Sequence, residues 1–213
     1  MALSHILSTF AERDIFKNMR QIIIFFLCLS AYLMTMAQTP EQSSRTEVLF
    51  ETSEGNIRIA LYNETPRHRD NFTKLVESHF YDSLLFHRVI PNFMIQAGDP
   101  DSRHAESGTL LGGGDLPYKL EPEIPEPAIR HRYGSVAAAR EGDDVNPNHL
   151  SSACQFYIVT RKGGTPHLDG AYTVFGEVVE GMDVANRIQR QMRDDDDRPV
   201  YDVRILRATV VHK

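Results

Sequence analysis

The sequence has no tryptophan and only two cysteines among its 213 residues. Cys28 lies in an N-terminal apolar run that we expect to be removed, which leaves Cys154 without an intrachain partner. A disulfide framework is therefore excluded for the mature protein, and the hydrophobic core has to stabilise the fold. Hydrophobic residues make up 41% of the chain and charged residues 24%, an ordinary globular composition that favours one main domain.

The N-terminal apolar run is too short to span a membrane. Ile22–Met34 covers 13 residues, whereas a transmembrane helix needs about 20. The run follows the basic start Met19-Arg20 and precedes the small-residue end Thr35-Met36-Ala37, which together match a secretory signal. We expect residues 1–37 to be an N-terminal extension plus signal peptide, cleaved after Ala37, and the protein to be exported, into the periplasm. A buried or membrane helix is the alternative.

The chain also lacks an excess of positive charge, since its net charge is −6. Residues 1–37 contain three basic and two acidic residues, so the remainder has 20 basic against 27 acidic residues and a net charge of −7. An acidic surface repels phosphate backbones, and nucleic acid is not expected as a partner.

Residue periodicity predicts strands and two helices. After a flexible polar lead-in at residues 38–46, apolar and polar residues alternate over Glu47–Thr52 and Asn56–Tyr62, which is typical of a β-hairpin. Helical spacing predicts helices at Pro66–His79 and Gly181–Met192. Further strands are expected within Leu84–Ile90, Phe93–Ala97, Gly134–Ala139, Gln155–Thr160, Ala171–Val179 and Tyr201–Val211.

The order of these elements predicts a mainly β fold. About seven or eight strands and two helices without βαβ alternation fit a closed antiparallel barrel capped by helices. In the last strand the apolar positions change phase by one residue after Ile205, which predicts a β-bulge or a change of packing face. The segment Pro100–Arg132 is rich in Gly and Pro, and so long a loop in a compact domain favours a functional wall or lid.

Sequence motifs for bond-breaking chemistry are missing. The chain has no Gly-x-Ser-x-Gly elbow, His-Glu-x-x-His pair or Cys-x-x-Cys pair, which argues against hydrolases that use a nucleophile or a metal. Gly112–Gly114 lacks the lysine and the following helix of a phosphate-binding loop. The acidic run Asp194–Asp197 is interpreted as a solvated loop rather than a metal site. No metal or other cofactor is expected.

One stretch combines a strong donor with an apolar surface. Phe86–Asp99 contains two apolar runs separated by Pro91-Asn92, and it supplies the guanidinium of Arg88 beside Phe93 and Met94, with the Gln96 amide close in sequence. Such a set suits a neutral substrate with a carbonyl group. From this pattern alone, a buried hairpin with a snorkelling arginine remains an open alternative.

Rotation about an X–Pro bond needs only such groups. Its barrier of about 18–20 kcal/mol comes from amide resonance. A guanidinium can donate to the nitrogen or carbonyl of the twisted imide while an apolar cup holds the ring. Lowering the barrier by about 7 kcal/mol corresponds to an acceleration of about 10⁵-fold.

The stretch Phe86–Asp99 resembles the signature segment of the cyclophilins, the peptidyl-prolyl cis-trans isomerases. The resemblance extends from about Glu47 to Val211 and implies an eight-stranded antiparallel barrel with two capping helices in a domain at residues 47–213. With the signal peptide, it implies an exported bacterial member that acts as a monomer on proline-containing polypeptides, with no membrane span after signal removal. The other matching segments are Gly134–Arg140, Cys154–Ile158, Leu168–Gly170 and Val174–Val178.

The resemblance also implies roles for individual residues. Arg88 matches the catalytic arginine, and Ala139 lies where the family lines the groove beside the substrate backbone. The residues that match the wall of the proline pocket are Phe93, Met94, Tyr157 and Leu168, and those that match its polar neighbours are Gln96 and Gln155.

Several positions depart from the best-known family pattern. Arg140 replaces an Asn, Cys154 a Ser and Tyr157 a Phe, while Tyr172 replaces a His and His167 a Trp at the pocket rim. The phenol of Tyr157 needs a partner or water. A chaperone or peptide-binding module that keeps the groove without useful catalysis is the rival interpretation, and the intact set of Arg88 and its neighbours argues against it.

Overall fold

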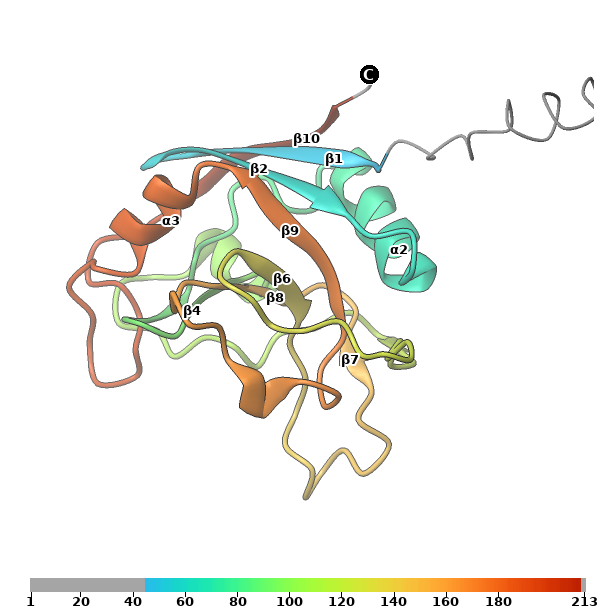
Figure 1. Cartoon of the computed structure of the whole chain (residues 1–213). Helices are drawn as coiled ribbons and strands as arrows, with labels where there is room; N and C mark the ends of the chain where they lie inside the picture. Colours follow the sequence, from blue (N-terminus) through green and yellow to red (C-terminus); the bar gives the residue numbers. More distant parts are fainter. Residues whose placement is uncertain (1–44, 212–213) are drawn as a thin grey trace, which may run out of the picture. The chain divides into compact units, whose positions relative to one another are not determined.

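The structure is a computed structural model that describes residues 45–211. The predicted signal peptide and residues 38–44 of the lead-in lie outside the described residues. Eight antiparallel strands form one curled sheet in the order β10-β1-β2-β9-β6-β8-β4-β3 (Figure 1). The strands are β1 (Glu47–Thr52), β2 (Gly55–Leu61), β3 (Arg88–Ile90), β4 (Met94–Ala97), β6 (Ser135–Ala138), β8 (Phe156–Val159), β9 (Val174–Glu180) and β10 (Ile205–Val211).

Two helices lie at opposite ends of this sheet, α2 (Pro66–Glu77) and α3 (Met182–Ile188) (Figure 1). Both predicted helices are present but end earlier than their apolar spacing suggests. In α2 the cause is local, because His79 adopts a left-handed φ of 59° that a helix does not continue through. Within residues 45–211 no helix is both long enough and apolar enough to cross a bilayer.

The prediction of a closed barrel is overstated. The two edge strands, β10 and β3, form no ladder with each other, so the sheet is a half-barrel. Its edges approach each other just outside these strands, through a β-bridge between Leu85 and Arg204. The predicted last strand is correspondingly shorter, because residues 201–204 lie outside the ladder that begins at Ile205.

The predicted phase change in the last strand is a β-bulge. Glu51 of β1 pairs with Arg207, whereas the next residue, Thr52, pairs with Ile205. Leu206 is therefore the extra residue of the bulge. It is 56% exposed, whereas Ile205 and Ala208 are buried. The bulge explains how one strand keeps Ile205 and Ala208 on the same packed side.

The central strands are buried on both faces. In β8 the side chains of Phe156 and Ile158 enter the main core, whereas Tyr157 and Val159 belong to a second cluster on the opposite face. This alternation follows from the two-residue period of a strand. The main core also takes in the apolar faces of α2 and α3, while the second cluster is completed by partly buried residues of loops.

The long predicted loop is mostly irregular and partly wraps α2. It contains a 3₁₀ turn at Pro100–His104 and the short strand β5 (Lys119–Leu120), which pairs with β7 (Ser151–Ser152). Glu123 from this loop accepts hydrogen bonds from the backbone N–H groups of Arg67 and His68, at 3.0 and 2.9 Å. A side chain distant in sequence thus caps α2, and Thr65 makes no side-chain cap.

Candidate active site

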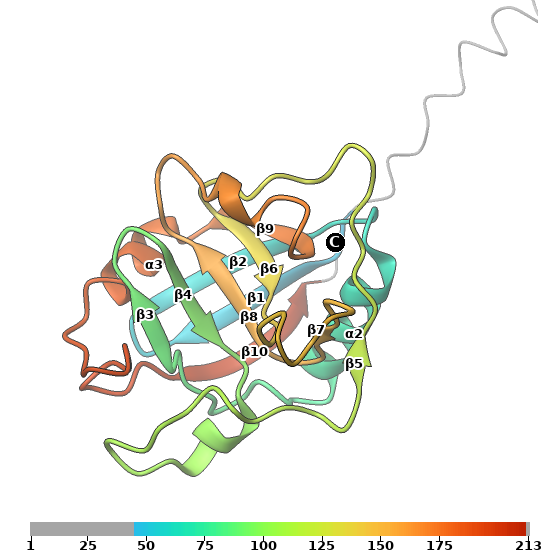
Figure 2. The same ribbon diagram turned by 90° about the horizontal axis from the view of Figure 1, so that it is seen from below.

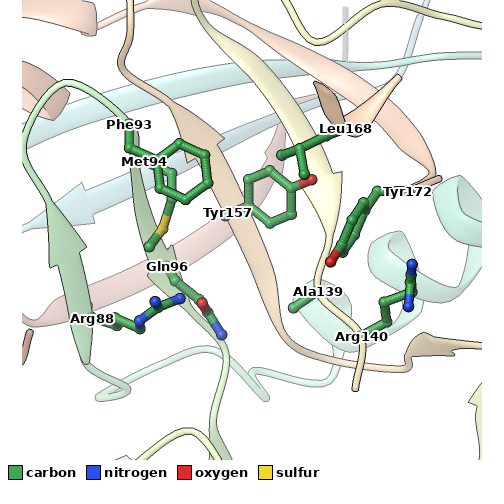
Figure 3. A pocket seen from close by; sticks show the side chains of 9 residues that line it. All are labelled: Arg88, Phe93, Met94, Gln96, Ala139, Arg140, Tyr157, Leu168 and Tyr172. Carbon is green, nitrogen blue, oxygen red and sulfur yellow. The ribbon is translucent and has the colours of Figure 1, made fainter. Parts of the chain in front are cut away.

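The second cluster carries a cavity of about 240 Å³ on the sheet face opposite the main core. Strands β3 and β4 continue the sheet beside β8 (Figure 2) and supply one wall, and the segments after β6 and β8 supply the other. Nine of the eleven predicted site residues line this cavity (Figure 3). They are Arg88, Phe93, Met94, Gln96, Ala139, Arg140, Tyr157, Leu168 and Tyr172.

Arg88 and Gln96 face the cavity as a cross-strand pair. They are direct partners in the β3–β4 ladder, which places both side chains on one face of the hairpin. Arg88 remains 44% exposed, so its guanidinium can reach a ligand without being desolvated first. The close-up shows the ends of both side chains directed toward the same end of the cavity (Figure 3).

Gln155, predicted as a polar neighbour, lies behind Gln96 rather than in the cavity wall. Its Oε1 accepts a hydrogen bond from Gln96 Nε2 at 2.9 Å. Its own Nε2 donates to the carbonyl oxygens of Gly112 and Gly114 at 2.9 and 2.6 Å. Gln155 thus fixes the amide of Gln96, and Gln96 Oε1 is left as an acceptor.

The glycine segment is held in place by a buried carboxylate. Asp99 is fully buried, and its side chain accepts hydrogen bonds from the backbone N–H groups of Gly112 and Gly114. Gly114 has no room for a side chain, because a Cβ there would lie 2.1 Å from the Asp99 carboxylate. Gly112–Gly114 is therefore held in place behind Gln155, and a functional role for the Pro100–Arg132 loop stays a prediction.

The apolar part of the cavity is formed by Phe93, Met94 and Leu168. Met94 is buried, whereas Phe93 and Leu168 are half-buried and keep part of their surface open to the cavity. His167, predicted at the pocket rim, is absent from the cavity lining and stacks on Phe93 with ring centroids 5.9 Å apart. Its contact with the pocket therefore runs through the ring of Phe93.

The phenol of Tyr157 has a partner that the sequence did not reveal. The hydroxyl lies 3.0 Å from Nε2 of His131, and Nδ1 of the same ring lies 3.0 Å from Oδ1 of Asp169. Burial lowers the pKa of His131 below its ordinary value, although the Asp169 carboxylate opposes that shift. A neutral His131 that donates to Asp169 accepts a hydrogen bond from the Tyr157 hydroxyl, so this polar group has a partner within the protein.

Arg140 and Tyr172 close the rim together. The Arg140 guanidinium lies 4.4 Å from the ring centroid of Tyr172, which is within cation–π range. Arg140 Nε donates to the carbonyl of Ala171 at 3.0 Å, and Nη1 forms an ion pair with Asp143 at 2.6 Å. The arginine that departs from the usual Asn is therefore committed to local contacts and shapes the cavity mouth.

Cys154 lies outside the cavity lining and is protected from reaction. Its thiol is buried and donates to the Asp115 carboxylate at 3.2 Å. Burial, together with this carboxylate, raises the pKa of Cys154 to about 12, so the thiolate is scarce at neutral pH. Between residues 45 and 211, no three His, Cys, Asp or Glu side chains are grouped to hold a metal ion.

Comparisons with known proteins show similarity in both sequence and fold. The family model described as cyclophilin type peptidyl-prolyl cis-trans isomerase/CLD matches residues 47–210. A relative from Aspergillus fumigatus, peptidyl-prolyl cis-trans isomerase-like 1, is 39% identical over 171 residues, which are 79% of this chain and 97% of that protein. An Arabidopsis thaliana peptidyl-prolyl cis-trans isomerase, CYP18-2, is 35% identical over 83% of this chain and 99% of its own length.

A solved structure agrees with the sequence matches. The crystal structure of a cyclophilin type peptidyl-prolyl cis-trans isomerase from Cryptosporidium parvum has a TM-score of 0.65 and 26% identity, and the match covers 79% of this chain and 99% of that one. The most similar of these relatives are fungal, so they lend no support to the expectation of a bacterial protein.

Proposed function

The chain belongs to the cyclophilin-type peptidyl-prolyl cis-trans isomerase family, and from this premise we propose that Arg88 is the group that accelerates rotation about X–Pro bonds in its polypeptide substrates. The observation that carries the proposal is the placement of the half-exposed Arg88 guanidinium beside the apolar side chains of Phe93, Met94 and Leu168 in one cavity. Catalysis of this rotation breaks no bond, and the proposed mechanism uses only protein side chains.

The mechanism follows from the electronic change on twisting the imide. In the planar ground state the nitrogen lone pair is delocalised, whereas in the twisted state it is localised and accepts a hydrogen bond. A donor aimed at this region stabilises the transition state more than the ground state, which is the condition for acceleration. Arg88 has Nη donors that no described neighbour uses in a hydrogen bond or ion pair, because its contact with the protein runs through Nε.

The apolar cup explains the selectivity for proline. A cavity of about 240 Å³ lies below the range of about 300–1,000 Å³ that drug-sized ligands occupy, so it fits one compact side chain. Phe93, Met94 and Leu168 contact such a ring from several sides. The Tyr157 ring completes the cup, while its hydroxyl is bound by His131.

Gln96 supports the arginine from the partner strand. Its Nε2 is bound to Gln155, so the free Oε1 is the atom that can accept from a substrate amide or from Arg88. We assign Gln96 the role of orienting the substrate carbonyl or the guanidinium. Ala139, Arg140 and Tyr172 are assigned to the groove beside the bound backbone.

A protease-coupled assay on a short proline peptide tests these assignments. Arg88→Ala is expected to lower kcat/KM by about 100-fold or more, because it removes the only donor aimed at the twisting bond. Unchanged acceleration in this variant would overturn the role of Arg88. If the purified wild-type protein suppressed aggregation yet left peptide exchange untouched, the peptide-binding alternative would replace the enzyme.

Export is a separate part of the proposal. It is supported by the basic start, the 13-residue apolar run and the small-residue end before Gln38. The mature protein would assist folding outside the cytoplasm, in the periplasm if the source is bacterial. N-terminal sequencing is expected to begin near Gln38, and recovery of soluble cytoplasmic protein that retains residues 1–37 would refute export.

The exported product is proposed to act as one domain, residues 47–213, and as a monomer. The net charge of −7 after signal removal supports the absence of nucleic acid among its partners. Light scattering of the mature protein checks the monomer, since a dimer would double the measured mass.

A further inference from the structure

The acidic run Asp194–Asp197 after α3 is a solvent-exposed loop at its first three residues and is closed by hydrogen bonds into a turn. The Asp194 carboxylate accepts hydrogen bonds from the backbone N–H groups of Asp196 and Arg198, at 3.0 and 2.9 Å. The backbone adds two bonds, from Asp197 N to the Asp194 carbonyl and from Asp194 N to the Arg198 carbonyl. These four hydrogen bonds close the turn between Asp194 and Arg198.

A buried arginine anchors this turn to the rest of the protein. The side chain of Arg198 is only 4% exposed, and its Nη1 donates to the carbonyl oxygens of Glu106 and Thr109 at 3.0 and 2.6 Å. Its Nη2 binds the carboxylate of Asp202 at 3.1 Å. The residue before this anchor, Asp197, is consequently held close to the sheet edge.

Asp197 meets strand β3 through both its backbone and its side chain. Its carbonyl oxygen accepts from the N–H of Val89, the residue after Arg88, at 2.8 Å. Its carboxylate lies between two guanidinium groups, with Oδ1 at 2.9 Å from Arg193 Nε and Oδ2 at 3.7 Å from Arg88 Nε. The backbone of Asp197 adopts a left-handed φ of 63°, which only a few residue types tolerate and which directs the side chain to this place.

We propose that Asp197 is a positioning residue for Arg88 in the isomerase reaction. The carboxylate attracts Arg88 from the Nε edge and leaves both Nη groups for the substrate. Because the carboxylate is only 29% exposed and its turn is anchored, it limits the rotamers of a side chain that is itself 44% exposed. The inference rests on the proposed catalytic role of Arg88, and it assigns a function to a residue of the acidic run.

The same turn supplies a matched control. Asp196 carries the same charge one residue earlier, its residue is exposed, and its carboxylate forms no ion pair within residues 45–211. Removing either charge changes the net charge equally. A difference between the two variants therefore reports the contacts of the Asp197 carboxylate, with Arg88 and Arg193, and not the general field of the acidic run. Kinetics in the Arg88→Ala background separate these two contacts.

Kinetics of the two Asn variants give the first measurement. Asp197→Asn keeps the size of the side chain, and Asn tolerates a positive φ. We expect it to lower kcat/KM by about two- to fivefold, the range for a partly exposed ion pair. Asp196→Asn is expected to leave kcat/KM unchanged. Asp197→Gly, which relaxes the backbone instead, is expected to show the same loss as Asp197→Asn, so a folding defect in one variant does not decide the result.

An NMR measurement separates this inference from the role of Arg88 itself. The Nε–H resonance of Arg88, assigned by its disappearance in Arg88→Ala, is expected to shift in Asp197→Asn and to stay in place in Asp196→Asn. In the Arg88→Ala background, Asp197→Asn is expected to cause no further loss of activity.

Three outcomes decide between the two claims. If Arg88→Ala is inactive while Asp197→Asn matches Asp196→Asn in rate and in the Arg88 resonance, the positioning role is wrong and the catalytic role stands. If Arg88→Ala retains full activity, the catalytic role fails and the positioning role with it, whatever the resonance does. A further loss in the double variant would show that Asp197 acts on the pocket independently of Arg88.

Discussion

The two faces of strand β8 carry similar residues, but one face packs into the main core and the other borders the cavity. Phe156 on one face stacks on Phe50 at 5.6 Å between ring centroids and meets Phe72 edge-on at 5.3 Å. Tyr157 on the other face has fewer neighbours of this kind and borders a cavity. The Phe156 ring is therefore buried among aromatic neighbours, whereas the apolar surface beside Tyr157 is left partly uncovered.

The difference indicates which apolar surface can contribute binding free energy for a substrate. Apolar area that stays uncovered in the free protein is removed from water when a proline ring enters, at about 25 cal/mol per Å². The main core has no such reserve, because its residues are already buried. Substitutions on the two faces should therefore separate stability from activity.

The largest expected effect is on the main core. Phe156→Ala should lower the free energy of unfolding by about 3–5 kcal/mol, because it removes a ring packed against several aromatic neighbours. Urea denaturation followed by circular dichroism measures this loss. The folded fraction should retain kcat/KM, and a large loss of specific activity would break the separation between the faces.

Acid should weaken the fold through a buried histidine, His87. Burial lowers the pKa of His87 to about 4, from an ordinary value of 6.5. Above pH 6.5 the ring is neutral in both states, but between pH 6.5 and 4 only the unfolded chain takes up a proton. The free energy of unfolding should therefore fall by about 3 kcal/mol across this window.

Replacement of the titrating ring checks the cause of this acid effect. Denaturation curves at several pH values should show a weaker pH dependence in His87→Phe than in the wild type. His68 and His131, whose pKa values burial also lowers, leave a residual dependence of the same sign. An identical pH profile in the variant would exclude His87 as the source.

The pocket face should show the opposite pattern to the main core. Phe93→Ala removes a half-buried ring from the cavity wall, so we expect kcat/KM to fall about tenfold, since burial against an aromatic ring contributes about 1.5–3 kcal/mol. The free energy of unfolding should change by less than in Phe156→Ala, the same substitution on the other face. Equal destabilisation of both variants would contradict the comparison.

The smallest expected effect concerns two buried phenols. Tyr157→Phe and Tyr81→Phe each remove one hydroxyl, which is bonded to His131 at 3.0 Å in the first case and to the Cys154 carbonyl at 3.1 Å in the second. Each loss should cost about 1 kcal/mol of stability. Peptide assays should show kcat/KM within about twofold of wild type for both, because the Tyr157 hydroxyl is already hydrogen-bonded to His131. A larger change in Tyr157→Phe alone would place that hydroxyl in the reaction.

Short-range patterns predicted much of this molecule from the sequence. The alternation in β1 and β2 and the phase change after Ile205 are local properties of a strand, so they could be predicted without knowing the pairing partner. The cavity residues on the β3–β4 hairpin are close in sequence and share one face by register. The residues on the far wall were placed by family resemblance, not by pattern.

Long-range contacts account for what the sequence did not predict. His131 lies 26 residues from Tyr157 in the sequence. The sequence predicted that the Tyr157 phenol needs a hydrogen-bond partner, but not which residue supplies it. Asp197 belongs to a run that looks solvated, and its contact with Arg88 depends on the distant anchor of Arg198. The predicted closure of the barrel was overstated, because a strand count does not reveal whether the two edge strands form a ladder.

The pairing of β1 with β10 has a consequence for the order of events during synthesis. The first strand of the domain lies between β2 and the last strand, from Glu47 opposite Val211 to Thr52 opposite Ile205. While the chain emerges, β1 can form its hairpin with β2, but its other edge stays open until the final strand is available. Such non-local pairing slows folding and exposes an unpaired edge in the meantime. The open edge of β1 is therefore covered only when Ile205–Val211 has left the ribosome.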